Sequence, residues 1–351
     1  MYETIYIEKN KTTRFGVHFY EDSTQWNVFM DCCGLKDKKT ALICHYDILN
    51  DTWKSFADMF AKEDAMFMTE QTDLDRVKDF MTNKRDQYTF VILCDELVMK
   101  CLYKMLTSED NRLAYVCVPA TAQAVFEGIS ICPLLDNYGN VLRKEILPLG
   151  VYVDFSLLSK ATATELQNVF ASAFRLAVSY KASLFEWMIA NMYELTDMEE
   201  DALFELLERG IQVWKERIEK DTAKDRAIAK YGEYFYNLLK ASGLVLSYAD
   251  MVTLSMVCQT YLSWKNEFIS MEEFYEIRDM FVLFGLSITE TDIKAEDLCK
   301  LLDDFEFNNM NKVDSFVYIR KVGKLILGDI PSKELLCEAI EQIYYNEESN
   351  E

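Results

Sequence analysis

The chain has 351 residues and a formal net charge of −22, and half of its positions are hydrophobic. This length exceeds the usual size of one domain and predicts two. So much negative charge argues against sequence-independent binding to nucleic acid or to an anionic membrane surface. Four prolines and eleven glycines are too few for low-complexity linkers or a turn-rich sandwich.

The ten cysteines are scattered along the chain, and only Cys32 and Cys33 are adjacent. The absence of a C-x-x-C pair argues against a disulfide framework or a zinc ribbon. The N-terminal stretch MYETIYIEKNK lacks the apolar core of a signal peptide, and no apolar run is long enough to span a bilayer. We therefore expect a soluble protein of the cytoplasm.

The first part of the chain alternates between two kinds of segment. Apolar runs typical of buried strands lie at 40–49, 88–94 and 113–119, and segments with helical spacing lie at 72–84 and 96–106. Such alternation predicts mostly parallel strands joined by crossover helices, and hence an open α/β sheet. The run at 150–158 predicts a last strand, which places this α/β domain at residues 1–160.

From about Thr164 onward the apolar residues recur with helical period, so the second domain, 161–351, is expected to be all-α. Near its end, residues 314–328 predict a β-hairpin. Residues 331–345 predict a closing helix with Ser332 as its N-cap.

Four stretches, in this order, are similar to motifs of a known family. VPATAQAVFEGIS (118–130) is similar to V-P-T-T-L-L-A-Q-V-D-S-S-V, and LPLGVYVDFSLL (147–158) to Q-P-x-x-V-x-x-D-x-x-x-L. AKYGEYFYNLLK (229–240) falls where the family has L-N-F-G-H-T-F-G-H-A-I-E, and YADMVTLSM (248–256) where it has H-G-E-A-V-A-I-G-M. The chain thus resembles the 3-dehydroquinate synthase family of sugar phosphate cyclases.

That resemblance implies an N-terminal α/β domain that binds NAD and a C-terminal helical domain that carries metal and substrate. The family uses zinc or cobalt. Its reaction oxidises a heptulosonate phosphate with NAD, eliminates phosphate, reduces the product again and closes a ring.

The metal ligands of the family do not survive at the aligned positions of this chain. The family holds its metal with one Glu and two His, and the resemblance places Ser172, Glu233 and Tyr248 there, with Asn237 at the second histidine of G-H-x-x-G-H. A hydroxyl, a carboxylate and a phenol do not make a competent zinc set. The two histidines of the chain lie before residue 50, so the helical half contains none.

The glycine loop of the family is also lost. Its G-G-G-x-x-G-D aligns with CDELVMK, in which Cys94, Asp95, Glu96 and Lys100 stand at the loop positions and no glycine remains. Glycines in such a loop let backbone amides approach a pyrophosphate, whereas Asp95 and Glu96 should repel one. We therefore predict that the chain binds neither NAD nor zinc.

Some polar positions survive, and two interpretations of them stay open. Arg226 matches a substrate-contacting arginine of the family, Arg175 a lysine, Asn140 an asparagine and Glu127 an aspartate. One interpretation is a residual anion pocket between the domains, built on Arg175 and Arg226 and joined by Lys230. The other is that these are salt-bridged helix residues of an acidic protein.

Two functions follow from these observations. The first is a non-catalytic pseudoenzyme, kept as a binding or regulatory subunit that associates with an active partner or senses a small anion. The second is an active 3-dehydroquinate synthase, or a related cyclase or lyase, that uses an altered, metal-free site. The habit of the family predicts pairing, either as a homodimer or as a heterodimer with an intact homologue.

Overall fold

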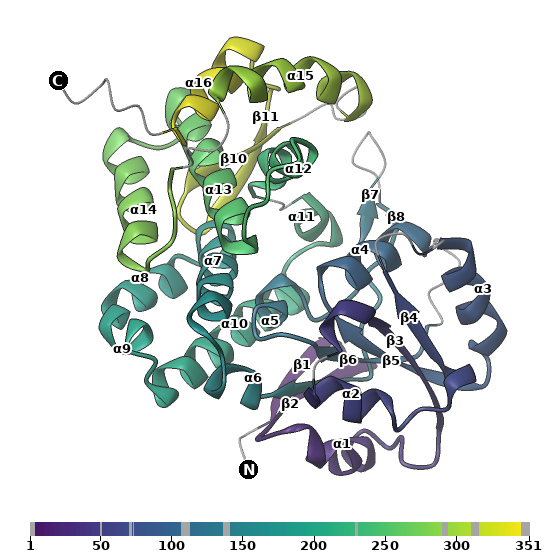
Figure 1. Ribbon diagram of the computed structural model, residues 1–351. Helices are drawn as coiled ribbons and strands as arrows, with labels where there is room; N and C mark the ends of the chain where they lie inside the picture. The colour runs from purple at the N-terminus through teal and green to yellow at the C-terminus, as the bar shows by residue number, and fades with distance from the viewer. Residues whose placement is uncertain are drawn as a thin grey trace. The chain divides into compact units, whose positions relative to one another are not determined.

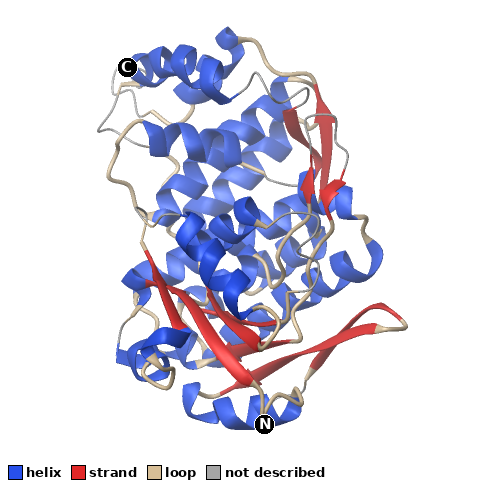
Figure 2. Cartoon of the chain, turned by 90° about the vertical axis from the view of Figure 1, so that its right-hand side faces the viewer, coloured by secondary structure: helices blue, strands red, loops and turns tan. Residues whose placement is uncertain are grey.

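The computed structural model describes residues 4–49, 51–69, 72, 74–106, 113–135, 141–228, 231–289, 294–309 and 316–344. The chain forms two compact units. The α/β unit comprises Met1–Ala161 and Phe204–Ala227, and the helical unit comprises Thr162–Leu203 and Ile228–Glu351. Figures 1 and 2 show the chain from two sides.

The α/β unit is built on a seven-stranded sheet with the order β1-β2-β9-β6-β5-β3-β4. Its strands are β1 (Ile5–Asn10), β2 (Thr13–Tyr20), β3 (Lys39–His45), β4 (Ala65–Met68), β5 (Tyr88–Cys94), β6 (Tyr115–Pro119) and β9 (Gly150–Asp154). Its helices are α1 (Trp26–Cys32), α2 (Asp51–Ala57), α3 (Leu74–Lys84), α4 (Glu96–Met105), α5 (Ala124–Glu127) and α6 (Ser156–Ser159). A small ribbon joins β7 (Leu134–Leu135) and β8 (Val141–Arg143). All strand pairs of the large sheet are parallel except β1 with β2.

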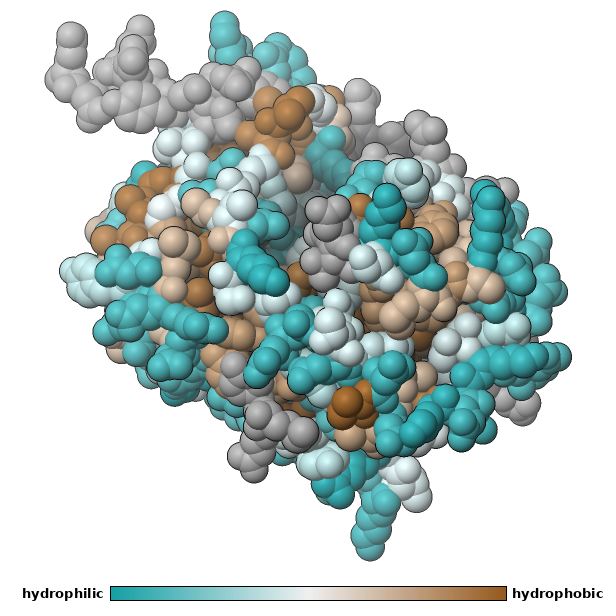
Figure 3. Space-filling view, turned by 60° about the horizontal axis from the view of Figure 1, so that its bottom comes forward, coloured by the Kyte–Doolittle hydropathy of each residue, from teal (hydrophilic) through white to brown (hydrophobic). Residues whose placement is uncertain are grey.

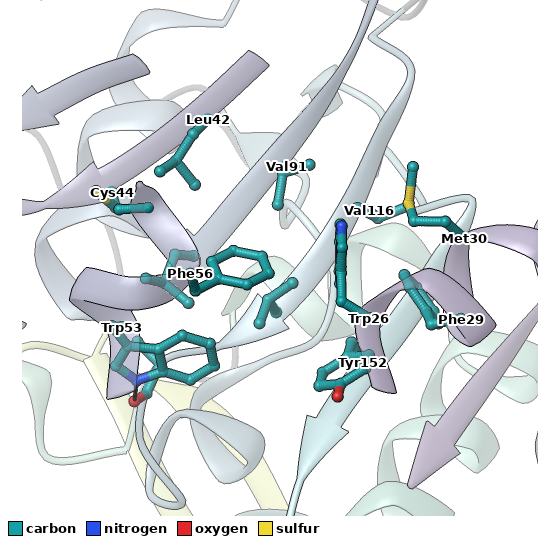
Figure 4. Packing of buried hydrophobic residues seen from close by; sticks show 14 of the residues in the cluster. Trp26, Phe29, Met30, Leu42, Cys44, Trp53, Phe56, Val91, Val116 and Tyr152 are labelled. Carbon is teal, nitrogen blue, oxygen red and sulfur yellow. Dashed lines mark hydrogen bonds between the residues drawn. The ribbon is translucent and has the colours of Figure 1, made fainter. Parts of the chain in front are cut away.

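The central strands are buried on both faces, which explains their continuous apolar runs. On one face α1 and α2 bring Trp26, Phe29 and Trp53 against the sheet, where they pack around Val91 and Tyr152 (Figure 4). Trp53 also donates a hydrogen bond from Nε1 to the carbonyl oxygen of Ala120, 2.8 Å away. The covering helices are therefore fixed to the sheet by both aromatic packing and a buried polar contact.

The helix α10 (Glu200–Lys220) belongs for the most part to the α/β unit, although the chain has already entered the helical unit. The ring of Phe204 lies 5.4 Å from that of Phe19 and 5.2 Å from that of Phe155. A Cβ at Gly210 would lie 2.5 Å from the ring of Phe126, so the small residue permits this packing. The sequence places 161–351 in one helical domain, whereas the structure returns Phe204–Ala227, with most of α11 (Ala223–Ile228), to the α/β unit.

The helical unit contains α7 (Ala163–Tyr180), α8 (Ala182–Ala190), α9 (Met192–Thr196), α12 (Glu233–Ala241), α13 (Tyr248–Lys265), α14 (Met271–Leu283), α15 (Ala295–Asn309) and α16 (Lys333–Glu341). An antiparallel hairpin of β10 (Phe316–Lys321) and β11 (Lys324–Gly328) lies where the sequence predicts one. The helix α13 is buried along nearly its whole length and packs against α7, α12, α14 and α16. Ser332 caps α16, as expected.

The fold class predicted from the sequence is confirmed, but several element ends differ. The run at 40–49 stops being a strand at His45 and continues as a short 3₁₀ helix, and the run at 150–158 ends as a strand at Asp154 before α6. The hairpin of β1 and β2 was not anticipated. The face in Figure 3 is mostly hydrophilic, with small hydrophobic groups between charged side chains. Among the described helices, none combines the length and the apolar character that crossing a bilayer requires.

A first prediction concerns Gly323, which turns the hairpin of β10 and β11 with a φ of +81°. A Cβ there would lie 2.4 Å from the backbone nitrogen of Ala182, so Gly323→Ala adds a backbone clash to the strain of a left-handed conformation. We expect it to lower the free energy of unfolding by about 2–4 kcal/mol. Gly243 has a φ of +76° and no atom within 4 Å of its Cβ position. The control Gly243→Ala should therefore cost only about 1–2 kcal/mol, and equal losses in urea unfolding would contradict the clash.

Candidate functional site

The order of the strands places a topological switch point between β3 and β5. The connection after β3 runs to β4 on one side, whereas the connection after β5 runs to β6 on the other. Ligands of open α/β sheets bind in the crevice outside the carboxyl ends of such a strand pair. In this chain β3 ends at His45, and β5 is followed by Asp95.

A hydrogen bond joins these two residues across the switch point. Asp95 Oδ2 lies 2.6 Å from His45 Nδ1, and both side chains are about six-sevenths buried. The other ring nitrogen of His45 lies 3.3 Å from the carboxylate of the exposed Asp47. The imidazole thus lies between two carboxylates.

The second oxygen of Asp95 caps α4. Asp95 has an extended backbone, and its Oδ1 accepts a hydrogen bond from the backbone N–H of Val98 at 2.8 Å. A helix N-terminus with free amides is the usual seat of a dinucleotide pyrophosphate. Here a carboxylate of the chain itself already satisfies one of these amides and adds negative charge, so the residues present do not fit a dinucleotide phosphate.

A second polar cluster surrounds Arg226, within the α/β unit. Its guanidinium donates to Glu145 Oε2 at 2.5 Å and to the carbonyl oxygen of Arg217 at 2.6 Å. The side chain of Arg226 is 1% exposed and that of Glu145 5%. Glu145 also accepts a hydrogen bond from the hydroxyl of Ser130 at 2.7 Å. Arg226 therefore has an internal carboxylate as its ion-pair partner.

Further charges gather around this pair. The Lys9 ammonium donates to the carbonyl oxygen of Ile218 at 2.6 Å, at the C-terminal end of α10, where a cation is favoured. Burial raises the pKa of Glu145, although Arg226, Lys9 and Arg217 act in the opposite direction. The cluster ties the first strand of the sheet to the returning helix.

The aligned metal positions lie in the helical unit, and two of them meet. Ser172 is on α7, and Tyr248 begins α13, which Ser247 caps through the backbone N–H of Asp250. The Ser172 hydroxyl lies 2.9 Å from the Tyr248 hydroxyl. The Arg175 guanidinium, one turn further along α7, lies 3.4 Å from the same phenol oxygen.

The third position, Glu233, starts α12 and is half-buried, as is Asn237 one turn later. Gly232 precedes them with a φ of +81°, which suits glycine at this helix start. Among the described residues, no group of three His, Cys, Asp or Glu side chains is placed to hold a metal ion. The donors at the aligned positions are a carboxylate and two hydroxyls that bond to each other, a set that does not fit zinc.

The remaining candidate residues are placed as follows. Arg175 and Arg226 belong to different units, so the pocket between them stays a prediction. Glu127 ends α5, Lys100 is exposed on α4, and Cys94 is buried with its sulfur 3.1 Å from that of Cys117. Asn140, Lys230 and the side chain of Glu96 lie outside the described part of the structure.

Sequence reasoning missed the partners of these residues. It did not identify the contact of His45 with Asp95, and it did not single out Glu145 or Lys9. An Asp directly before a helical segment is a signal for an N-cap and identifies half of the role of Asp95. Glu145 and Arg226 are 81 positions apart, and no local pattern links them.

Comparison with known proteins finds similarity to 3-dehydroquinate synthases. Residues 170–304 match the family of the 3-dehydroquinate synthase C-terminal domain. A 3-dehydroquinate synthase of Thermoanaerobacter pseudethanolicus is 23% identical over 229 residues, which is 63% of this chain and 64% of that enzyme. The match thus spans somewhat less than two thirds of the length of this relative.

Solved structures show the same fold. A 2-deoxy-scyllo-inosose synthase complexed with carbaglucose-6-phosphate, NAD+ and Co2+ has a TM-score of 0.68 at 12% identity, covering 96% of this chain and 99% of that one. A 2-epi-5-epi-valiolone synthase of Streptomyces hygroscopicus with NAD+ and Zn2+ bound has a TM-score of 0.65 at 14% identity, covering 96% and 98%. At these identities the likeness concerns the fold alone.

The cap of α4 can be tested by substitution. Asp95→Ala removes the acceptor of the Val98 amide and leaves His45 without its partner, so we expect the free energy of unfolding to fall by about 1–3 kcal/mol. Asp95→Asn keeps a cap acceptor and removes only the charge, and it should cost less. Urea unfolding of the two variants measures the difference in their free energies of unfolding. Equal losses would show that the cap contributes nothing to stability.

The raised pKa of Glu145 predicts a pH dependence of stability. Because the folded state holds the proton of Glu145 more tightly than the unfolded state, this group stabilises the fold most below the ordinary pKa of 4.5. That contribution is lost as the pH rises from about 4.5 through the raised pKa. In urea unfolding across this range, the stability of the native chain relative to Glu145→Gln should fall with rising pH. A difference that grows with pH would contradict the shift.

Proposed function

We propose that this chain, a divergent member of the 3-dehydroquinate synthase-like family, is a non-catalytic binding or regulatory subunit. The observation that carries the proposal is the cap of α4 by Asp95 at the switch point of the sheet. The family's reaction starts with hydride transfer to NAD. To bind at this edge of the sheet, the phosphates of NAD would have to displace the Asp95 carboxylate, which contacts His45. The negative charge of the Asp95 carboxylate would repel these phosphates.

The metal positions support the same proposal. A Lewis acid activates the substrate hydroxyl in the family's chemistry, and the donors at the aligned positions here are Ser172, Glu233 and Tyr248. The hydroxyls of Ser172 and Tyr248 satisfy each other at 2.9 Å. Hydroxyl and phenol oxygens are poor zinc ligands beside imidazole, thiolate and carboxylate.

The arginine retained from the substrate site adds a third argument. Arg226 is paired with Glu145 and nearly completely buried. To bind an external anion, Arg226 would have to exchange this carboxylate for the ligand, and the buried carboxylate would then be left without its partner. The chain thus carries its own anion where the family's substrate is expected to bring one.

One observation favours the alternative, an active cyclase or lyase with an altered site. Arg175 remains beside the phenol of Tyr248, at 3.4 Å. A guanidinium next to a phenol can bind an oxyanion and lower the free energy of a phenolate. This cluster would have to activate a substrate without a metal.

Turnover separates the two functions. We expect no phosphate release from the heptulosonate phosphate in the presence of NAD and a divalent metal ion, because hydride acceptor and Lewis acid both lack their sites. Glu233→His should not restore activity, since Ser172, Tyr248 and Asp95 remain. The synthase of Thermoanaerobacter pseudethanolicus, assayed in parallel, serves as the positive control. Phosphate release by the unmodified chain that Arg175→Gln abolishes would refute the non-catalytic role and support the altered enzyme.

A further inference from the structure

The helix α14 of the helical unit presents an unusual outer face. Its inner side is buried through Phe274, Ile277 and Phe281, and the ring of Phe281 lies 5.5 Å from that of Phe174. Its outer side exposes four large apolar residues: Met271 at 47%, Tyr275 at 41%, Val282 at 51% and Leu283 at 50%. Single exposed apolar residues are ordinary on a protein surface. Four of them on one helix of 13 residues form a patch.

These side chains lie in two neighbouring rows. Positions three or four apart share a side of an α-helix, which places Met271, Tyr275 and Val282 in one row. Arg278 completes this row, with its guanidinium 5.9 Å from the centre of the Tyr275 ring. The row is therefore apolar with one cation beside its aromatic ring.

The second row follows the first by one position. It consists of Glu272, Glu276, Asp279 and Leu283, all of them exposed. An apolar row thus runs alongside a row with three carboxylates over the length of α14, about 20 Å. A surface of this kind is complementary to a helix with one apolar row and one basic row.

We propose that the outer face of α14, made by these two rows, is a docking surface for a basic amphipathic helix of another protein. The inference rests on the proposed binding role and names the class of partner for it. The helical spacing of both rows matches a helix laid along α14, and the three carboxylates select lysine or arginine on the partner.

Charge argues against a second copy of this chain as the occupant. The chain carries a net charge of −22, and two α14 faces placed together would oppose three exposed carboxylates from each copy. Like charges juxtaposed across an interface are unfavourable. An anionic membrane surface is disfavoured for the same reason.

The test uses a synthetic amphipathic peptide of leucine and lysine, about 14 residues long, with a fluorescent label read by anisotropy. A peptide of identical composition in scrambled order controls for general attraction to an acidic protein. We expect saturable binding of the amphipathic peptide and about tenfold weaker binding to the double variant Tyr275→Ser, Val282→Ser. The variant Glu276→Gln, Asp279→Asn should bind more weakly and with a smaller dependence on salt.

A matched control uses apolar residues exposed elsewhere in the same unit. Tyr193, on α9, is 74% exposed, and Val245 is fully exposed. The variant Tyr193→Ser, Val245→Ser should bind the peptide like the native chain. Equal binding of the scrambled peptide, or equal losses in the control and the α14 variants, would overturn the proposal.

Two further measurements separate the remaining outcomes. If sedimentation shows a dimer that the Tyr275→Ser, Val282→Ser variant loses, the face joins two copies and the proposal is wrong. Phosphate release measured on the same native preparation tests the non-catalytic role by itself. Catalysis together with position-specific peptide binding would remove the proposed function but keep the docking surface.

Discussion

The backbone amides at the start of α4 require an acceptor, and Asp95 provides it from within the chain. In a parallel sheet the connections after β3 and β5 diverge and leave an opening at the carboxyl edge. Proteins that bind dinucleotides leave helix amides at this edge to be satisfied by the ligand's phosphates. Here one oxygen of Asp95 bonds to the Val98 amide and the other to His45. One of these amides is therefore satisfied from within the chain.

The same principle recurs at two other places. Arg226, an arginine of the kind that contacts an anionic substrate, is neutralised by Glu145. The hydroxyls of Ser172 and Tyr248, at positions aligned with metal ligands, bond to each other. Buried polar groups are nearly always paired. Each of these contacts supplies such a partner from within the chain.

The sequence predicts the parts of this structure that local pattern determines. Short apolar runs identify β5, β6 and the core of β3, because these strands are buried on both faces. Helical period identifies α3, α4 and α7, because their apolar residues recur every three or four positions. The apolar run at 40–49 extends past the end of β3 at His45, because its apolar residues continue into the short 3₁₀ helix at Tyr46–Ile48. In the α/β unit, Phe204 of α10 contacts Phe19 and Phe155. Amphipathic spacing predicts the helix but does not show which unit it packs against.

The candidate site shows the same limit. Alignment brings Ser172 and Tyr248 together in advance, because both stand at ligand positions that the family's metal unites. It does not predict Glu145 beside Arg226, since no motif covers Glu145. Loss of a motif is visible in a sequence, whereas the residue that compensates for the loss appears only when distant segments are seen in contact.

Under the proposed non-catalytic role, these contacts would make a return to catalysis difficult. A histidine introduced at Glu233 would still share the aligned positions with Ser172 and Tyr248, whose hydroxyls bond to each other. Release of Arg226 from Glu145 would leave a buried carboxylate without its partner. The two contacts belong to different units, so a change at one leaves the other in place. The proposed binding role then depends on what the surface of the chain contacts, and the outer face of α14, with its paired apolar and acidic rows, is the surface that we propose for such a contact.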